Sequence, residues 1–263
     1  MKVIVIKYGG SLLDDANRES LFLEQLAREW KLHRHRLVLV HGGGKEITRQ
    51  MAKSGIEAKF VGGRRFTDEK TMDFVEKALQ SLNAGIVQKL RAYGAASDGY
   101  SGRYRHLLIA ESIPELGRVG QPTASGVKLD VLAGLTNANL LPVFYPVGED
   151  ASGQPLNINA DDFAQALAIA LHANELIFLT DTGGVLDKAG QLVPQINPGG
   201  ADLLVKNGTI TGGMEVKIQA CLAAIRQGVG KVHIGKSIFS DAQGLHVEDG
   251  TAIVKEGPTV QIL

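Results

Sequence analysis

The sequence has one cysteine, Cys221, among its 263 residues, so no disulfide can form within the chain. Proteins without disulfides are typical of a reducing compartment, and we expect a cytoplasmic location. Lys plus Arg and Asp plus Glu both number 28, which leaves no net charge. Because nucleic-acid-binding proteins usually carry a basic excess, this balance argues against nucleic acid as a partner. No apolar run is long enough to cross a membrane, and the first residues have the pattern of a strand rather than of a signal peptide.

Several signatures of catalysis are also missing. The sequence contains no zinc ligand set, no GxSxG elbow and no CxxC pair. Its glycines match neither the P-loop nor the dinucleotide fingerprint. Zinc chemistry, serine hydrolysis at an elbow, thiol–disulfide exchange and hydride transfer are therefore not indicated. We expect no protein-bound metal site, and we read Cys221 as a packing residue in a helix.

Strand-like and helix-like segments alternate along almost the whole chain. Runs such as 37–40 and 176–180 are apolar without alternation, which indicates strands buried on both faces of a parallel sheet. Helical spacing covers 18–33, 69–92 and 160–172, and 58–66 reads as a hairpin that turns at two glycines. Residues 94–126 are predicted to be rich in loops. We therefore predict an α/β fold with helices on both faces of a mainly parallel sheet, and ligands at the carboxyl ends of its strands.

The first candidate site follows the first strand, residues 2–6, where Lys7 is followed by Tyr8, Gly9 and Gly10. Glycine turns bring backbone N–H groups close to phosphate oxygens, and a lysine beside them adds a positive charge. The stretch predicts either a phosphate cradle or an ordinary joint between a strand and a helix. The choice between these two interpretations depends on other segments of the sequence.

A second glycine turn, His41-Gly42-Gly43-Gly44, follows the strand at 37–40 and precedes a helix. Two anion sites at neighbouring strands would suit a phosphate donor and an anionic acceptor. For His41 itself, a hydrogen bond to the backbone is the simpler interpretation, and we assign it no acid–base role.

Arg64 and Arg65 follow the glycine pair of the predicted hairpin. Arginine is suited to bidentate binding of a carboxylate, but neighbouring side chains on a strand point to opposite faces. We therefore expect only one of the two to reach a ligand, and a solvated surface pair is the alternative.

Polar residues Asn157, Asn159 and Asp161 lie between apolar elements and share one face of an extended segment. Asp161 could cap a helix, orient lysines at a phosphate site or hold Mg²⁺. The loop after the strand at 176–180 is polar and rich in glycine, which is suitable for a nucleotide. Lys217 lies one turn into a helix that opens with Gly212 and Gly213, and it is either solvated or directed back toward that helix start.

Taken together these motifs resemble the amino acid kinase family. The resemblance rests on an ordered set: Lys-x-Gly-Gly, His-Gly-Gly-Gly, Gly-x-Arg-x-Thr, Asn-x-Asn-Ala-Asp, Leu-Thr-Asp-x-x-Gly-Val-Leu and Gly-Gly-Met-x-x-Lys. It implies a three-layer αβα sandwich in which 1–174 bind the acyl amino acid and form the dimer, and 175–263 bind ATP. The implied reaction is ATP-dependent phosphorylation, with Mg²⁺, of the side-chain carboxylate of N-acetyl-L-glutamate, a step of arginine biosynthesis.

The resemblance also implies a role for each matching position. Lys7 and Lys217 would stabilise charge on the transferring phosphoryl group, and Asp161 would orient both. Gly9 and Gly10 would bind phosphate. The acceptor would contact Gly43, Gly44, Arg65 and Asn157. The nucleotide region would comprise Thr180, Asp181, Gly183, Gly184, Val185, Leu186, Gly212 and Gly213. A carboxylate acceptor is already ionised at neutral pH, so no general base is needed.

Three departures from the family pattern affect these expectations. Ala84-Gly85 replace the family's usual Asn-Lys, and 97–106 are more basic and aromatic than is usual. Arg64, Arg103 and Arg105 would suit an N-succinyl acceptor, or one attached to a small acidic carrier protein. The chain also begins directly at its first strand, without the helix of hexameric, arginine-inhibited members, and we expect a homodimer that arginine does not inhibit. A non-catalytic nucleotide or amino-acid sensor is the alternative from another functional class.

Overall fold

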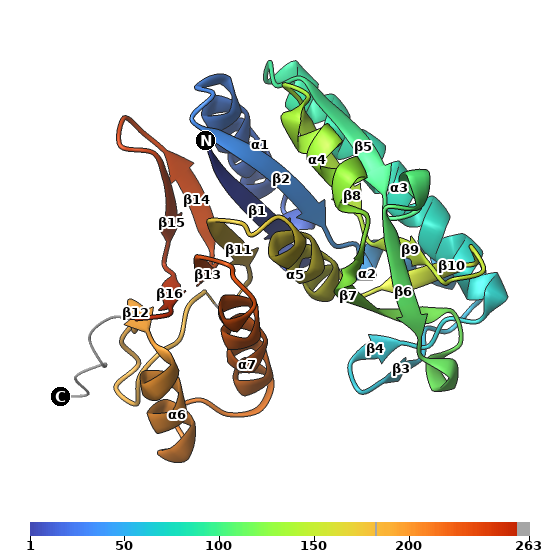
Figure 1. The fold of residues 1–263 in the computed structure, drawn as a ribbon. Helices are drawn as coiled ribbons and strands as arrows, with labels where there is room; N and C mark the ends of the chain where they lie inside the picture. The colour runs from blue at the N-terminus through green and yellow to red at the C-terminus, as the bar shows by residue number, and fades with distance from the viewer. Residues whose placement is uncertain (182, 257–263) are drawn as a thin grey trace.

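The computed structural model describes residues 1–181 and 183–256 of the chain. One eight-stranded sheet runs through the molecule, and only its β13–β16 pair is antiparallel (Figure 1). From one edge to the other its strands are β12 (Gln195–Ile196), β16 (Thr251–Val254), β13 (Lys231–Gly235), β11 (Glu175–Leu179), β1 (Lys2–Tyr8), β2 (His35–His41), β8 (Leu141–Tyr145) and β5 (Ser97–Ser101). Strand β1 therefore lies between β2 and β11, which belong to distant parts of the chain.

Helices cover both faces of this sheet, which gives the three layers predicted from the sequence (Figure 1). One face carries α1 (Ala16–Lys31) and α3 (Glu69–Ala92), with α2 (Gly44–Lys53) packed against α3. The other carries α4 (Leu129–Asn137), α5 (Ala160–Ala170) and α7 (Gly212–Arg226), with α6 (Pro198–Lys206) packed against α7.

Alternate residues of the central strands explain why these strands are apolar without interruption. Val5 and Val38 pack into one buried cluster with Phe163 of α5. Ile4 of the same strand packs with Leu23 of α1 in a second cluster on the opposite face. A strand covered on both faces needs apolar side chains at every position. Cys221 is fully buried in the first cluster, as expected of a packing residue.

The prediction that residues 94–126 are rich in loops is wrong. This region contains β5, β6 (Leu108–Ser112) and β7 (Val119–Val127), with one-turn helices η2 (Tyr104–His106) and η3 (Pro114–Leu116). Strands β6 and β7 close a small barrel with β9 (Val147–Glu149) and β10 (Pro155–Ile158). Strand β7 is polar and contains a proline, so its pairing depends on barrel closure rather than on a hydrophobic run.

Two hairpins complete the fold: β3 (Phe60–Val61) with β4 (Arg64–Arg65), and β14 (Ser237–Ser240) with β15 (Leu245–Glu248). The first turns at Gly62 and Gly63, as predicted, and both have positive φ, as a two-residue type I′ turn requires. Among the described residues, no helix combines the length and apolar character needed to cross a membrane.

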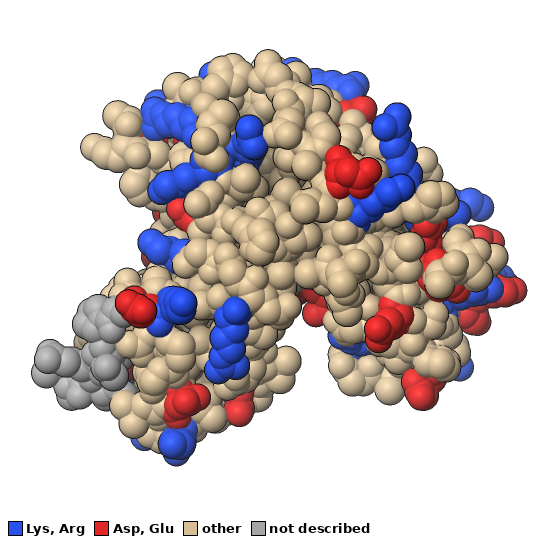
Figure 2. Space-filling model, in the orientation of Figure 1, with Lys and Arg blue, Asp and Glu red and all other residues tan. Residues whose placement is uncertain are grey.

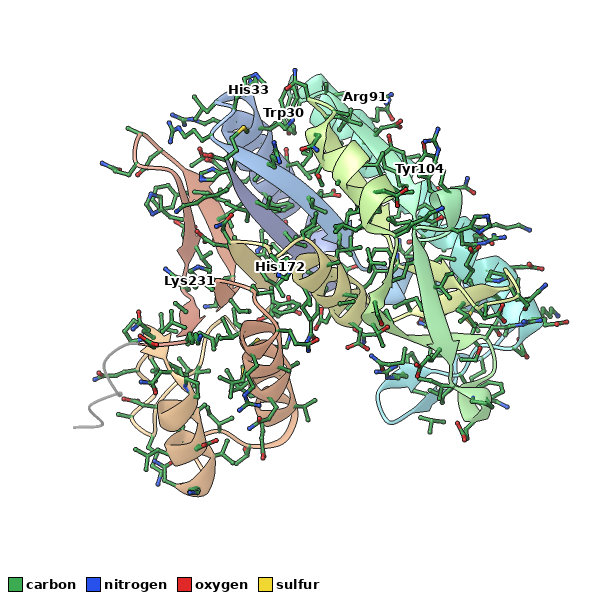
Figure 3. The ribbon with its side chains drawn as sticks, viewed as in Figure 1. Trp30, His33, Arg91, Tyr104, His172 and Lys231 are labelled. Carbon is green, nitrogen blue, oxygen red and sulfur yellow. The ribbon has the colours of Figure 1, made fainter. Side chains whose placement is uncertain are left out.

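Figure 2 shows lysine and arginine interspersed with aspartate and glutamate on the visible face. This face is hollowed between the part built by α6 and α7 and the part that carries the β3–β4 hairpin (Figures 1 and 2). His172 and Lys231, labelled in Figure 3, precede β11 and begin β13, at the amino ends of these strands. The motifs singled out in the sequence lie at the opposite, carboxyl ends.

Candidate active site

The two glycine turns lie against each other at the carboxyl ends of β1 and β2. The N–H of Gly42 donates a hydrogen bond of 2.8 Å to the carbonyl oxygen of Tyr8. A Cβ atom at Gly9 would lie 3.3 Å from Lys7 Nζ and 3.5 Å from the Cα atom of Gly42. Gly10 has φ +66° and begins the one-turn helix η1 (Gly10–Leu13). These contacts place the two predicted anion sites side by side.

Two helices begin at this edge without a side-chain cap. Gly43, which has no side chain, precedes α2, and Thr211, whose side chain makes no capping hydrogen bond, precedes α7. Helices α1, α3, α5 and α6 are capped by Asp15, Asp68, Asn159 and Asn197, respectively. The first N–H groups of α2 and α7 are therefore available to an anion. Helix α4, whose first residue follows Lys128, also lacks a side-chain cap.

Asp161 connects the two candidate lysines. Its Oδ1 lies 2.8 Å from Lys7 Nζ at the end of β1, and its Oδ2 lies 3.4 Å from Lys217 Nζ on α7. Capping of α5, the alternative role for Asp161, falls to Asn159, whose side chain accepts from the N–H groups of Asp161 and Asp162. The carboxylate of Asp161 is therefore left for the lysines, as the family resemblance implies.

The charge state of Asp161 follows from these contacts. Burial alone would raise the pKa of the Asp161 carboxyl, but Lys7 and Lys217 outweigh it and hold this pKa below its usual range. The group is thus ionised at neutral pH. The ammonium of Lys217 also lies 5.8 Å from the centre of the Phe178 ring, a favourable position for a cation over an aromatic face.

A pocket of about 270 Å³ opens beside this constellation. Lys7, Gly10 and Asp161 line it together with Arg65 and Asn157. Its remaining lining residues are Gly42, Gly43, Gly44, Ile47, Phe60, Gly63, Arg64, Leu79, Val119, Pro146, Ile158, Asn159 and Ala160. The pocket thus brings together all four residues predicted to bind the acceptor, which are Gly43, Gly44, Arg65 and Asn157.

Arg64 and Arg65 turn to different partners, as expected for neighbours on a strand. Arg65 is buried and donates from Nη2 to the Gly44 carbonyl and to Thr48 Oγ1, both at 2.8 Å. Arg64 donates instead to Asp162 and Gln121. Both arginines line the same pocket, and the expectation that only one of them reaches a ligand stays a prediction.

The predicted nucleotide segment lies next to the first glycine turn. A Cβ atom at Gly10 would lie 3.3 Å from Oδ2 of Asp181. Thr180 Oγ1 donates to the carbonyl oxygen of Gly183, which has φ +69°. Gly184 has no room for a side chain, because a Cβ atom there would lie 2.4 Å from Thr251 Oγ1.

The rest of that segment divides into a buried and an open part. Val185 is buried, and its N–H donates to Thr251 Oγ1, so it supports the loop from the core. Leu186 is about half exposed. Gly212, with φ +57°, has open space around its Cβ position, and it opens α7 together with Gly213. These positions are where a nucleotide could approach the loop and the start of α7.

Two residues that support the site were missed from the sequence. Thr67 Oγ1 accepts from Asn157 Nδ2 and donates to the Arg65 carbonyl, so it joins two predicted acceptor contacts. Asn83 is buried and its Nδ2 lies 3.1 Å from Nε2 of His41. Thr67 could have been found as the last residue of Gly-x-Arg-x-Thr, whereas no local signal marks Asn83.

His41 is a supporting residue, as interpreted from the sequence. It is fully buried, and its Nδ1 lies 2.7 Å from the Gly42 carbonyl oxygen. Burial lowers the pKa of His41 to about 4. The ring is therefore neutral at pH 7 and holds the glycine turn by a hydrogen bond.

The residues described in 1–181 and 183–256 include no cluster of three or more His, Cys, Asp or Glu side chains suited to a metal ion. Both oxygens of Asp161 already face lysines. The site therefore offers charge stabilisation by lysines and N–H groups, with no carboxylate set for a cation.

A family model described as the amino acid kinase family matches residues 2–236. The chain belongs to this family. An acetylglutamate kinase of Endomicrobium trichonymphae is 37% identical over 256 residues, covering 97% of this chain and 99% of the relative. Another, of Agrobacterium fabrum, is 39% identical and covers 96% and 91%.

Solved structures agree with membership of the amino acid kinase family. The crystal structure of smu.665 from Streptococcus mutans has a TM-score of 0.80 and 30% identity, covering 97% of this chain and 99% of that one. A carbamate kinase of Giardia has a TM-score of 0.67 at 17% identity, covering 97% and 99%, and supports the fold alone.

Proposed function

We propose that this chain is an acetylglutamate kinase, which transfers the γ-phosphoryl group of ATP to the side-chain carboxylate of N-acetyl-L-glutamate. The product would be N-acetylglutamyl 5-phosphate, an intermediate of arginine biosynthesis. The observation that carries the proposal is Asp161 between Lys7 and Lys217, at the edge of the acceptor pocket. The names of the relatives support the choice of acceptor.

The chemistry asks for positioning and charge stabilisation. A carboxylate oxygen of the acceptor forms a bond to the γ-phosphorus, while the bond from that phosphorus to the bridging oxygen breaks and ADP leaves. Lys7 and Lys217 would neutralise the negative charge on the transferring group. Asp161 would hold both ammonium groups in place, and the N–H groups of Gly9 and Gly10 would bind phosphate oxygens.

The remaining predicted residues would bind the two substrates. Arg65 and Asn157 would bind the α-carboxylate of the acceptor, and the turn at Gly43 and Gly44 would cradle its chain. Residues 1–174 would form the acceptor lobe and 175–263 the nucleotide lobe, joined by one continuous sheet. The nucleotide would contact Thr180, Asp181, Gly183, Gly184, Leu186, Gly212 and Gly213, with Val185 behind them. Mg²⁺ would enter on the phosphates of ATP, because the described side chains offer no set of carboxylates for it.

The charges around the pocket favour an uncharged acyl group over the N-succinyl and carrier-linked alternatives. Arg64 is paired with Asp162, and Arg103 lies 3.0 Å from Glu76 Oε1. Of the three arginines that would suit an anionic acyl group, Arg64 lines the pocket and is already neutralised, and Arg103 is neutralised outside the pocket lining. The apolar side chains of Phe60, Val119 and Ile158 in the lining suit the methyl group of an acetyl.

A homodimer is part of the proposal, as is a cytoplasmic location. In the described part of the chain, β5 pairs only with β8, so its outer edge is free to meet a second copy. A surface groove beside β5 is lined by residues of α3, among them Arg91, by residues of β5 and by Tyr104. Arg91 and Tyr104 are labelled along this flank in Figure 3.

A hydroxamate assay tests the proposal. The purified chain, ATP and Mg²⁺ are incubated with hydroxylamine and with N-acetyl-L-glutamate, N-succinyl-L-glutamate, free L-glutamate or carbamate. We expect acyl-phosphate trapping with N-acetyl-L-glutamate above all others. Preference for another acceptor would refute the substrate, and no product with any of them would favour a sensor.

A further inference from the structure

Arg64 forms a polar cluster with Asp162 and Gln121 in the wall of the acceptor pocket. Its Nη2 donates to Asp162 Oδ2 at 2.7 Å and to Gln121 Oε1 at 2.5 Å. Asp162 lies in the first turn of α5, next to Asp161, and Gln121 lies on β7. The side chains of Arg64 and Asp162 are 27% and 24% exposed, so their charges are partly removed from water. The variable position of Gly-x-Arg-x-Thr holds Arg64, and the motif assigns it no role.

The place of this cluster follows from the other contacts in the pocket. An N-acylated glutamate presents a side-chain carboxylate, an α-carboxylate and an acyl group. Under the proposed function, the first faces Lys7 and Asp161, and the second faces Arg65 and Asn157. The acyl group is left with the rest of the wall, where Arg64 is the one charged residue among the lining residues not yet assigned.

We propose that Asp162 masks the charge of Arg64 and thereby restricts the acceptor pocket to uncharged acyl groups. This inference rests on the proposed function and deepens it by naming what selects the acyl group. An acyl carboxylate that approached Arg64 would have to compete with Asp162 and would meet the negative charges of Asp161 and Asp162. Without the Asp162 carboxylate, the guanidinium would pair with an anionic acyl group.

The hydrogen bonds of Arg64 support this role. Its Nη1 is buried and has no hydrogen-bond partner in the described structure. A guanidinium can donate two parallel N–H···O bonds to one carboxylate. Arg64 therefore retains an unused donor, and loss of the Asp162 charge would leave Gln121 as the described acceptor on Nη2 and the guanidinium charge without its anionic partner.

The test compares kcat/KM for N-succinyl-L-glutamate with that for N-acetyl-L-glutamate in full-length variants. In Asp162→Asn we expect the succinyl-to-acetyl ratio to rise by about tenfold or more, which is what one hydrogen bond to a charged group contributes. In Arg64→Gln the unmasked carboxylate should lower the ratio below that of the wild type. In the double variant Arg64→Gln/Asp162→Asn the gain should disappear. Calorimetric titration with N-succinyl-L-glutamate provides a readout that does not depend on turnover.

Glu76→Gln is the matched control, because it removes the nearer of two carboxylate partners of Arg103, which is not among the residues that line the acceptor pocket, and should leave the ratio unchanged. An unchanged ratio in folded Asp162→Asn, or a gain that persists in the double variant, overturns the inference. If Asp162→Asn does not fold, Arg64→Gln tests the inference: a succinyl-to-acetyl ratio below that of the wild type supports it, and an unchanged or higher ratio overturns it. Failure of the proposed function is a separate result, because the wild type would then not phosphorylate N-acetyl-L-glutamate.

Discussion

The two lysines of the site come from opposite ends of the chain and meet on one carboxylate. Lys7 approaches Oδ1 of Asp161 and Lys217 approaches Oδ2. Because each oxygen engages a different lysine, one carboxylate holds both ammonium groups at the site. Such preorganised charge is often the largest contribution to catalysis of group transfer.

Lys7→Ala tests the contribution of one of these charges. We expect kcat to fall by about 10²–10³, the usual loss for one charge-stabilising donor, while the fold is retained. Steady-state kinetics measures the loss, and circular dichroism checks the fold. Lys2→Ala, at the exposed start of the same strand, is the control and should turn over normally. Near-normal turnover in Lys7→Ala would refute the role given to Lys7.

His41 predicts a dependence of stability on pH. Its pKa is about 4 in the folded protein, against 6.5 for the solvated histidine of an unfolded chain. Between these values the unfolded chain binds more protons, so stability rises with pH and is lost as pH falls from about 6.5 to about 4. At ~1.4 kcal/mol per pKa unit the full loss is about 3 kcal/mol.

Urea unfolding of the wild type and of His41→Asn at several pH values between 7 and 4.5 measures this dependence. The variant should be less stable at pH 7, and its stability should fall less steeply over this interval. Two parallel curves would show that His41 does not titrate as its burial requires. The carboxyl of Asp161 does not interfere, because its lowered pKa places its titration below this window.

At the scale of elements, the start of α5 carries most of the site. Asn159 caps the helix, Asp161 faces the lysines and Asp162 holds Arg64. Because Asn159 caps the helix, the carboxylates of Asp161 and Asp162 in the same turn are free for other partners.

Asn159→Ala should therefore affect both stability and catalysis. Loss of the cap is expected to reduce the free energy of unfolding by about 1 kcal/mol, as measured by urea denaturation. Fraying of this turn should also lower kcat, because Asp161 would no longer be fixed. Asn159→Ser, which can still cap, should retain most of both properties. If Asn159→Ala and Asn159→Ser behave alike, capping is not what this side chain contributes.

Local signals made some elements predictable and left others hidden. Helix α3 was predicted at 69–92, because Thr67-Asp68 resembles a helix start, and Asp68 does accept from the N–H of Thr71. Strand β7 was hidden because its polar residues are held by β6 and β10, which lie at other places in the sequence. The short strand β12, which pairs with the distant β16, was missed for the same reason, and the β14–β15 hairpin was also missed.

The candidate site was predictable where charge and glycine coincide with strand ends. Lys7, Asp161 and Lys217 were grouped from the sequence through the family resemblance, and the structure brings them together; their roles stay predictions. The Arg64–Asp162 pair could not be predicted, because its partners are far apart in the sequence and neither stands at a fixed position of a motif. Asn83 was missed for a similar reason, because its hydrogen bond to the buried ring of His41 joins residues that are far apart in the sequence.

At the scale of the whole molecule, the edge strand β5 and helix α3 predict how two copies meet. Size-exclusion chromatography with light scattering should give the mass of a dimer for the wild type. Ala84→Arg, on the groove formed by α3 and β5, should give a monomer. Leu21→Arg, at an exposed position of α1, is the control and should stay dimeric. A hexameric wild type, or a dimeric Ala84→Arg, would contradict this arrangement.

The central position of β1 also has a consequence for synthesis of the protein. This strand is made before both of its neighbours in the sheet, the second of which is β11, and the second lysine of the site follows only at residue 217. A chain that emerges from the ribosome folds its early segments first, so β1 and β2 could pair long before β11 exists. The phosphate cradle would then be exposed at an incomplete sheet edge. A nascent chain should therefore complete its charge constellation only when α7 docks, and products truncated before α7 should be inert.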